Sequence, residues 1–311
     1  RILCPAAKKT TTSKGNYTTI TTETTTIESI DRQTQLRTMN PSEDEVLAAL
    51  AHYRATVLQN NRAVFQRFVQ HVETAALAAA ENASVDPNRI SRACQRFFYR
   101  KLYVSRPENL DPSLQINAPA DVMGKWDALA RAFVLDGAYV GADDKRREVL
   151  RQNYRNGVEA ELRRIDPALR FPADFEILMS QVDSLEGPGW PQYRQEGQQV
   201  CFWEGLGESE DEAGCSVFGP DGRIAKELSL EDWETVAGWE CGTGPETTCF
   251  VAYCRHEEDG KEWGWRYGAE QGQYGIEIFD NVVELLQWYE TLYMPPLDYR
   301  LDIFMGDIFR Q

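Results

Sequence analysis

Hydrophobic and polar residues follow two different periods along this chain. Between residues 42 and 182, apolar positions recur mainly at steps of three and four, which is typical of amphipathic helices. Between residues 199 and 279, apolar and polar residues tend to alternate around turn-forming residues, which indicates strands. A last helical pattern covers residues 280–293. Helices followed by strands and a closing helix predict the α+β class with an antiparallel-rich sheet, preceded by an all-α domain.

The helical part begins at a capping box, Ser42-x-x-Glu45. A long apolar stripe follows it, although the polar pair Asn60-Asn61 leaves open whether it forms one helix or two. A further helix starts at Asp86-Pro87, as a cap followed by a first-turn proline. Opposite its apolar face is a row of arginines, Arg89, Arg92, Arg96 and Arg100. We interpret this row as a solvated face; the alternative is a grip on a phosphate or an acidic partner.

The second part begins with a helix after Asp143-Asp144, and a shorter helix over 171–185 follows it. Strands are predicted over 199–203, 216–218 and 223–228, the last two around the turn Pro220-Asp221-Gly222. Residues 230–237 are predicted to form a short helix carrying Trp233, and strands are predicted over 249–254, 263–267 and 274–279. These elements together describe a helix pair, a sheet and a closing helix.

Composition shifts divide the chain into four predicted segments. Residues 1–40 contain twelve threonines and few large apolar residues, so we predict a disordered Thr-rich tail. Residues 41–140 are predicted to form a helical domain, 141–293 an α+β domain and 294–311 a C-terminal extension. Mean hydropathy is −0.50. With neither a long apolar run nor a secretory signal pattern, we predict no membrane span and a cytoplasmic location.

Negative charge is concentrated in one segment. The formal net charge is −16, and residues 201–260 hold fifteen Asp or Glu against three Lys or Arg. Such a surface repels nucleic acid, so the composition favours a protein partner with a basic surface. Tryptophans are interleaved with these acids, and exposed indoles commonly anchor protein interfaces. The predicted partner-binding residues are Trp203, Glu204, Glu208, Glu210, Asp211, Glu212, Trp239 and Glu240.

Motifs of known chemistry are missing from the sequence. It contains no GxSxG, P-loop or HExxH pattern. Cys241, Cys249, Cys254 and His256 lack the spacing of a common zinc site, and Cys249 and Cys254 suit a strand core better. We therefore predict no cofactor, no metal and no catalytic residue. A carboxylate-dependent hydrolase is the remaining enzymatic alternative, because paired acids are plentiful.

A family resemblance rests on short motifs in the second part. Glu161-Leu162 precedes the step Phe171-Pro172-Ala173-Asp174-Phe175, and Phe279-Asp280-Asn281 opens the closing helix after Trp233. In this order they resemble the SUKH superfamily, the Smi/Knr-type domain of fungal cell-wall assembly regulators and bacterial immunity proteins. Phe171 replaces the family's usual leucine, and Asp183-Ser184 stands where the family has Asn-Gly. The resemblance covers 141–293 and implies an α+β protein-binding scaffold without catalytic apparatus.

Two functions follow from the resemblance and the acidic segment. The first is an intracellular, non-enzymatic regulator of the fungal type, favoured by the helical extension and the Thr-rich tail. The alternative is an immunity-type protein whose acids match the basic surface of a toxin.

Overall fold

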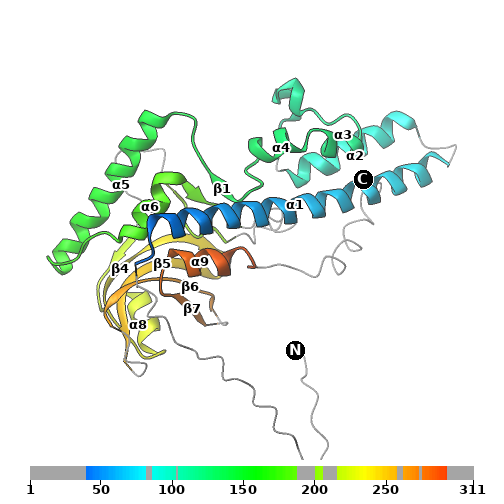
Figure 1. Cartoon of the computed structure of the whole chain (residues 1–311). Helices are drawn as coiled ribbons and strands as arrows, with labels where there is room; N and C mark the ends of the chain where they lie inside the picture. Colours follow the sequence, from blue (N-terminus) through cyan, green and yellow to red (C-terminus); the bar gives the residue numbers. More distant parts are fainter. Residues whose placement is uncertain are drawn as a thin grey trace, which may run out of the picture. The chain divides into compact units, whose positions relative to one another are not determined.

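The computed structural model describes residues 40–81, 86–102, 104–187, 200–205, 216–257, 262–272 and 275–292 (Figure 1). These residues belong to one compact unit, Thr38–Gln311. The predicted Thr-rich tail and C-terminal extension lie outside the described residues. Within the described ranges, the chain mixes helices with antiparallel sheets, as predicted for an α+β protein.

One long helix, α1 (Glu43–Ala80), contributes buried residues to two separate hydrophobic cores. The predicted capping box is formed: Ser42 and Glu45 exchange hydrogen bonds at its start. The helix is unbroken at Asn60-Asn61, because the buried Asn61 donates through Nδ2 to the carbonyl oxygen of Leu135 at 2.7 Å. Its first half packs into the same core as the sheet, although this half lies within the predicted helical domain 41–140. Its second half packs against the helices that follow it.

Helix α2 (Pro87–Lys101) begins at the predicted Asp86 cap, and its apolar side lies in the second core. Two short helices, α3 (Pro119–Gly124) and α4 (Trp126–Ala132), follow α2 along the chain. They complete this core with residues that include Val122, Trp126 and Leu129. The 3-10 turns Pro107–Asn109 and Pro112–Leu114 connect α2 to α3.

The second part begins with strand β1 (Ala138–Tyr139), helix α5 (Asp144–Ile165), helix α6 (Ala173–Gln181) and strand β2 (Ser184–Leu185). The predicted acidic start of α5 is confirmed, since Asp143 accepts from two backbone N–H groups there. β1 and β2 pair antiparallel. Further along the chain follow β3 (Ser216–Phe218), α8 (Arg223–Ser229), β4 (Trp233–Gly244), β5 (Thr247–His256), β6 (Gly264–Glu270), β7 (Ile276–Phe279) and α9 (Val282–Tyr289).

Strands β3 to β7 form an antiparallel sheet in sequence order. β5 is buried on both faces. Cys249 and Val251 face the large core with α5, α6 and α9, whereas Phe250, Ala252 and Cys254 face α8. The sheet is therefore a layer between helices on both sides, which explains the apolar run along β5.

Two predictions around Trp233 are wrong. Residues 223–228, predicted as a strand, lie in α8, because Ile224, Ala225 and Leu228 share one helical face against the sheet. The predicted helix 230–237 is absent. Asp232 adopts a left-handed backbone conformation with φ of 61°, and β4 begins directly after it at Trp233. The strands predicted over 216–218, 249–254, 263–267 and 274–279 all correspond to β3, β5, β6 and β7.

Candidate functional site

The two tryptophans expected on the surface are inside the protein. Trp203 and Trp239 are both 0% exposed and belong to the large core. Trp239 stacks with Phe171 at a centroid distance of 5.4 Å, and its Nε1–H donates to the Tyr154 hydroxyl at 3.0 Å. Trp203 packs edge-on against Phe175. The prediction of an exposed indole anchor at either position is therefore wrong, because β4 turns Trp239 toward the large core and the segment 200–205 buries Trp203 in the same core.

The predicted acids do not share one surface. Glu240 neighbours Phe250 across the β4–β5 pair, on the face of α8, and its Oε1 lies 3.7 Å from Nη2 of Arg223. Glu204 accepts a hydrogen bond from the hydroxyl of Thr243. Glu208, Glu210, Asp211 and Glu212 lie outside the described residues. Of the predicted set, only Glu204 is placed at a cavity that the structure describes.

That cavity forms where the segment 200–205 joins two sheets. Leu185 of β2 bridges to Trp203, and the backbone N–H groups of Cys201 and Glu204 donate to β4 carbonyl oxygens at 2.8 and 3.0 Å. Gly242 makes this approach possible, since a Cβ there would meet the Cys201 carbonyl oxygen at 2.1 Å. β4 also carries a register irregularity between Glu240 and Gly242. Backbone pairing between distant segments thus fixes the walls of the cavity.

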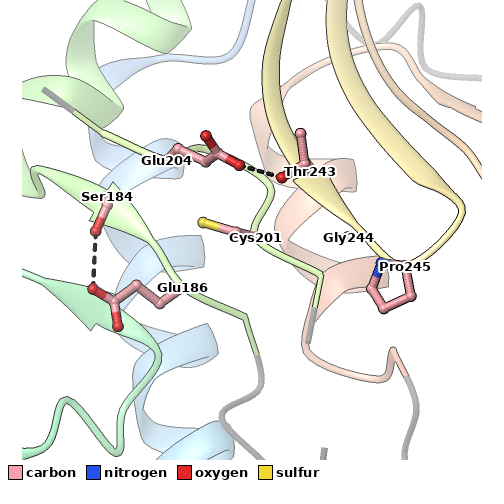
Figure 2. A pocket seen from close by; sticks show the side chains of 7 residues that line it. All are labelled: Ser184, Glu186, Cys201, Glu204, Thr243, Gly244 and Pro245. Atoms are coloured by element: carbon pink, nitrogen blue, oxygen red, sulfur yellow. Dashed lines mark hydrogen bonds between the residues drawn. The ribbon is translucent and has the colours of Figure 1, made fainter. Parts of the chain in front are cut away.

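The cavity is an open depression of about 620 Å³. Its lining comes from β2, the segment 200–205 and the end of β4 with the turn after it: Ser184, Glu186, Cys201, Glu204, Thr243, Gly244 and Pro245 (Figure 2). Of these described residues, two carry carboxylates and none carries a basic side chain. The Ser184 hydroxyl donates to Glu186 Oε1 at 3.4 Å, and Thr243 donates to Glu204. Each carboxylate is thereby held by a hydroxyl at the cavity wall.

Cys201 lies between these two pairs in Figure 2. Its Sγ is 3.2 Å from the Leu185 carbonyl oxygen and 3.3 Å from the Trp203 carbonyl oxygen, and the thiol can donate to either. Burial, with added repulsion from Glu204 and Glu186, raises the pKa of this thiol to about 12. At neutral pH Cys201 is therefore a protonated thiol and a poor nucleophile. Thiol-based covalent catalysis does not fit this cavity.

Cys241, Cys249, Cys254 and His256 do not converge on one point. Cys249 points to the large core and Cys254 to the core under α8, on opposite faces of β5. Within the residues that the structure describes, no group of three His, Cys, Asp or Glu side chains could hold a metal ion. His256 instead lies edge-on to the Trp233 ring, with centroids 5.1 Å apart.

Sequence reasoning missed Glu186, Ser184, Cys201 and Thr243 as neighbours of Glu204. Glu186 follows directly on β2, and Thr243 lies almost sixty residues further along the chain in β4. No local pattern links them, because the contact depends on the pairing of segment 200–205 with β4. The acidic composition of 201–260 pointed to the region but not to this geometry.

Comparison of the chain with protein-family models, with curated proteins and with solved structures gives no match. In the ranges that the structure describes, none of the helices combines the length and the apolar character needed to cross a membrane.

Proposed function

We propose that this chain is a non-enzymatic protein-binding module whose acidic cavity receives basic side chains of a partner protein. The observation that carries the proposal is the cavity itself. It places the carboxylates of Glu186 and Glu204 in one depression, together with the hydroxyl groups of Ser184 and Thr243. A carboxylate held in place by a hydroxyl accepts a guanidinium or ammonium group with little loss of conformational freedom.

The surrounding charge supports this assignment. Residues 201–260, which include Glu204 and the turn beside it, carry fifteen acids against three basic residues. Such a field accelerates the approach of a basic partner, while the contacts within the cavity determine how long the partner stays. The buried tryptophans stabilise the scaffold beneath the cavity and do not contact the partner, since both are 0% exposed.

The resemblance to Smi/Knr-type domains supports a regulatory scaffold of the fungal type. The Phe-Pro-Ala-Asp-Phe motif lies at the start of α6, where Asp174 accepts from the Tyr267 hydroxyl and from the backbone N–H of Val282 in α9. It therefore ties the helix pair to the sheet and to the closing helix. A role in neutralising a basic toxin is the alternative within the same binding class, and the identity of the captured partner separates the two.

Binding of a fluorescein-labelled Arg-rich peptide, followed by anisotropy, tests the proposal. In the E186Q/E204Q variant of the full chain, we expect affinity to fall about tenfold or more, since a hydrogen bond to a charged group contributes about 1.5–3 kcal/mol. The matched control is E231Q/E277Q, which removes two exposed carboxylates outside the cavity. Equal weakening by both variants would show that only net charge matters and would overturn the assignment of the cavity.

A further inference from the structure

A second charged surface, of opposite sign, lies on helix α2. Its outer face carries Arg89, Arg92, Arg96 and Arg100, all exposed and separated by steps of three, four and four. At a rise of 1.5 Å per residue, the four side chains extend along about 16 Å of the helix. In a chain with net charge −16, the stretch from 86 to 106 holds six Lys or Arg against one Asp.

The described residues provide no carboxylate partner for these four arginines. α2 itself contains no acidic residue. The hydrogen bonds that do form stay within the helix: Arg92 Nε donates to the Asn88 carbonyl oxygen at 3.2 Å, and Arg96 Nε to the Arg92 carbonyl oxygen at 3.4 Å. The outer ends of these guanidinium groups therefore remain available to another molecule.

Arginines on α5 show a different arrangement in the same protein. Most of them pair with carboxylates of α5 itself, of α6 or of the residue before β2: Arg147 with Asp144 and Asp183, Arg151 with Glu148, Arg155 with Glu176, Arg163 with Glu159 and Arg164 with Glu161. On α5, most arginines are thus balanced by a nearby carboxylate. On α2 that balance is missing, which sets its arginine row apart from a routine solvated helix face.

We propose that the arginine row of α2 is a docking face for an acidic polypeptide segment. A guanidinium group binds a carboxylate through two parallel hydrogen bonds. Four guanidinium groups along one helix face can therefore bind carboxylates that repeat along one side of a peptide. The opposite side of α2 is fixed in the second core by Ile90, Cys94 and Phe98. The helix therefore presents the row on a rigid support, and binding need not order the protein side.

A polypeptide fits this surface better than a nucleic acid or a membrane. A ligand about 16 Å long stays over the arginine row. A longer polyanion extends beyond the row and is repelled by the rest of the chain, whose net charge is −16. This inference goes beyond the acidic cavity. With two surfaces of opposite sign, one chain could hold a basic and an acidic partner at once.

A fluorescein-labelled Glu-rich helical peptide is the probe, and its anisotropy is measured with the full chain. We expect R92Q/R96Q to weaken binding by about tenfold and added salt to weaken it further. The control R163Q/R164Q removes two exposed arginines of α5 that are paired with Glu159 and Glu161, and should change affinity less than about twofold. Circular dichroism of both variants checks that the fold is retained.

A second pair of variants separates recognition from charge. R92K/R96K keeps both positive charges but loses the planar fork, so we expect affinity between those of the parent chain and R92Q/R96Q. Equal effects of R92Q/R96Q and R163Q/R164Q would overturn the proposal. Tighter binding of duplex DNA or of anionic lipid vesicles than of the Glu-rich peptide, at the same salt concentration, would also overturn it.

Discussion

Asp174 connects three elements of the α+β core, and its removal is the sharpest test of how that core is held together. The side chain is 3% exposed. Its Oδ1 accepts from the Tyr267 hydroxyl of β6 at 2.5 Å, and its Oδ2 accepts from the backbone N–H of Val282 at the start of α9 at 3.0 Å. The carboxylate thus supplies an acceptor to a helix N-terminus that would otherwise leave a buried donor unsatisfied.

The cost of Asp174→Ala follows from the donors that it leaves behind. The Tyr267 hydroxyl and the Val282 N–H, both buried, lose their acceptor at about 1–3 kcal/mol each, and the Phe175 N–H loses its contact with Oδ1 at 3.0 Å. The variant no longer buries the Asp174 carboxylate, which offsets part of this cost. We therefore expect a net loss of about 3 kcal/mol in the free energy of unfolding. Urea denaturation of the variant measures this loss. The exposed Asp221→Ala provides a control that should change stability by less than about 0.5 kcal/mol.

A double-mutant cycle isolates the Asp174–Tyr267 bond. Asp174→Ala, Tyr267→Phe and the double variant should show a coupling energy of about 1.5–3 kcal/mol, because the acceptor is a charged group. Additive effects would mean that this hydrogen bond contributes nothing specific. The junction between α6 and β6 would then not depend on this bond.

The pH dependence of the same variant has a definite sign. Burial is the largest influence on Asp174 and raises its pKa, although the hydrogen bonds from Tyr267 and Val282 oppose that shift. A carboxyl whose pKa is higher in the folded state stabilises the fold below its unfolded pKa, and this contribution is lost as pH rises through the folded pKa. Relative to Asp174→Asn, the parent chain should therefore lose stability as pH rises from about 4 upward. A constant difference across that range would contradict the raised pKa.

Two further predictions concern the acidic cavity. Gly242→Ala should lower the free energy of unfolding by about 2 kcal/mol or more, because its Cβ would meet the Cys201 and Phe202 carbonyl oxygens at 2.1 and 2.3 Å; a neutral urea curve would refute this close approach. Cys201, whose pKa is about 12, should react with iodoacetamide at pH 8 about a thousandfold more slowly than a free cysteine, measured by site-resolved mass spectrometry. Its rate should rise about tenfold per pH unit, and fast labelling at pH 8 would show that the thiol is not buried as described.

The sequence by itself determined the elements whose signals are local. The Ser42 capping box, the Asp86 cap and the acidic start of α5 appear where the residues predict them, because a helix end is satisfied within one turn. The apolar face of α6 has the same local origin, since Leu178 and Met179 lie three and four residues after Phe175 and all three are buried. These features depend only on neighbours three or four residues away.

Only the tertiary structure decided which surfaces exist. Trp203 and Trp239 look like interface anchors in sequence, yet packing with Phe175 and Phe171 in the large core buries them completely. Asn61 looks like a helix break, but it is buried within α1, and its Nδ2 donates to the distant Leu135 carbonyl oxygen. The cavity exists because segment 200–205 pairs with β2 and β4. The partners of those backbone groups lie tens of residues away, and no periodicity in the chain specifies such contacts.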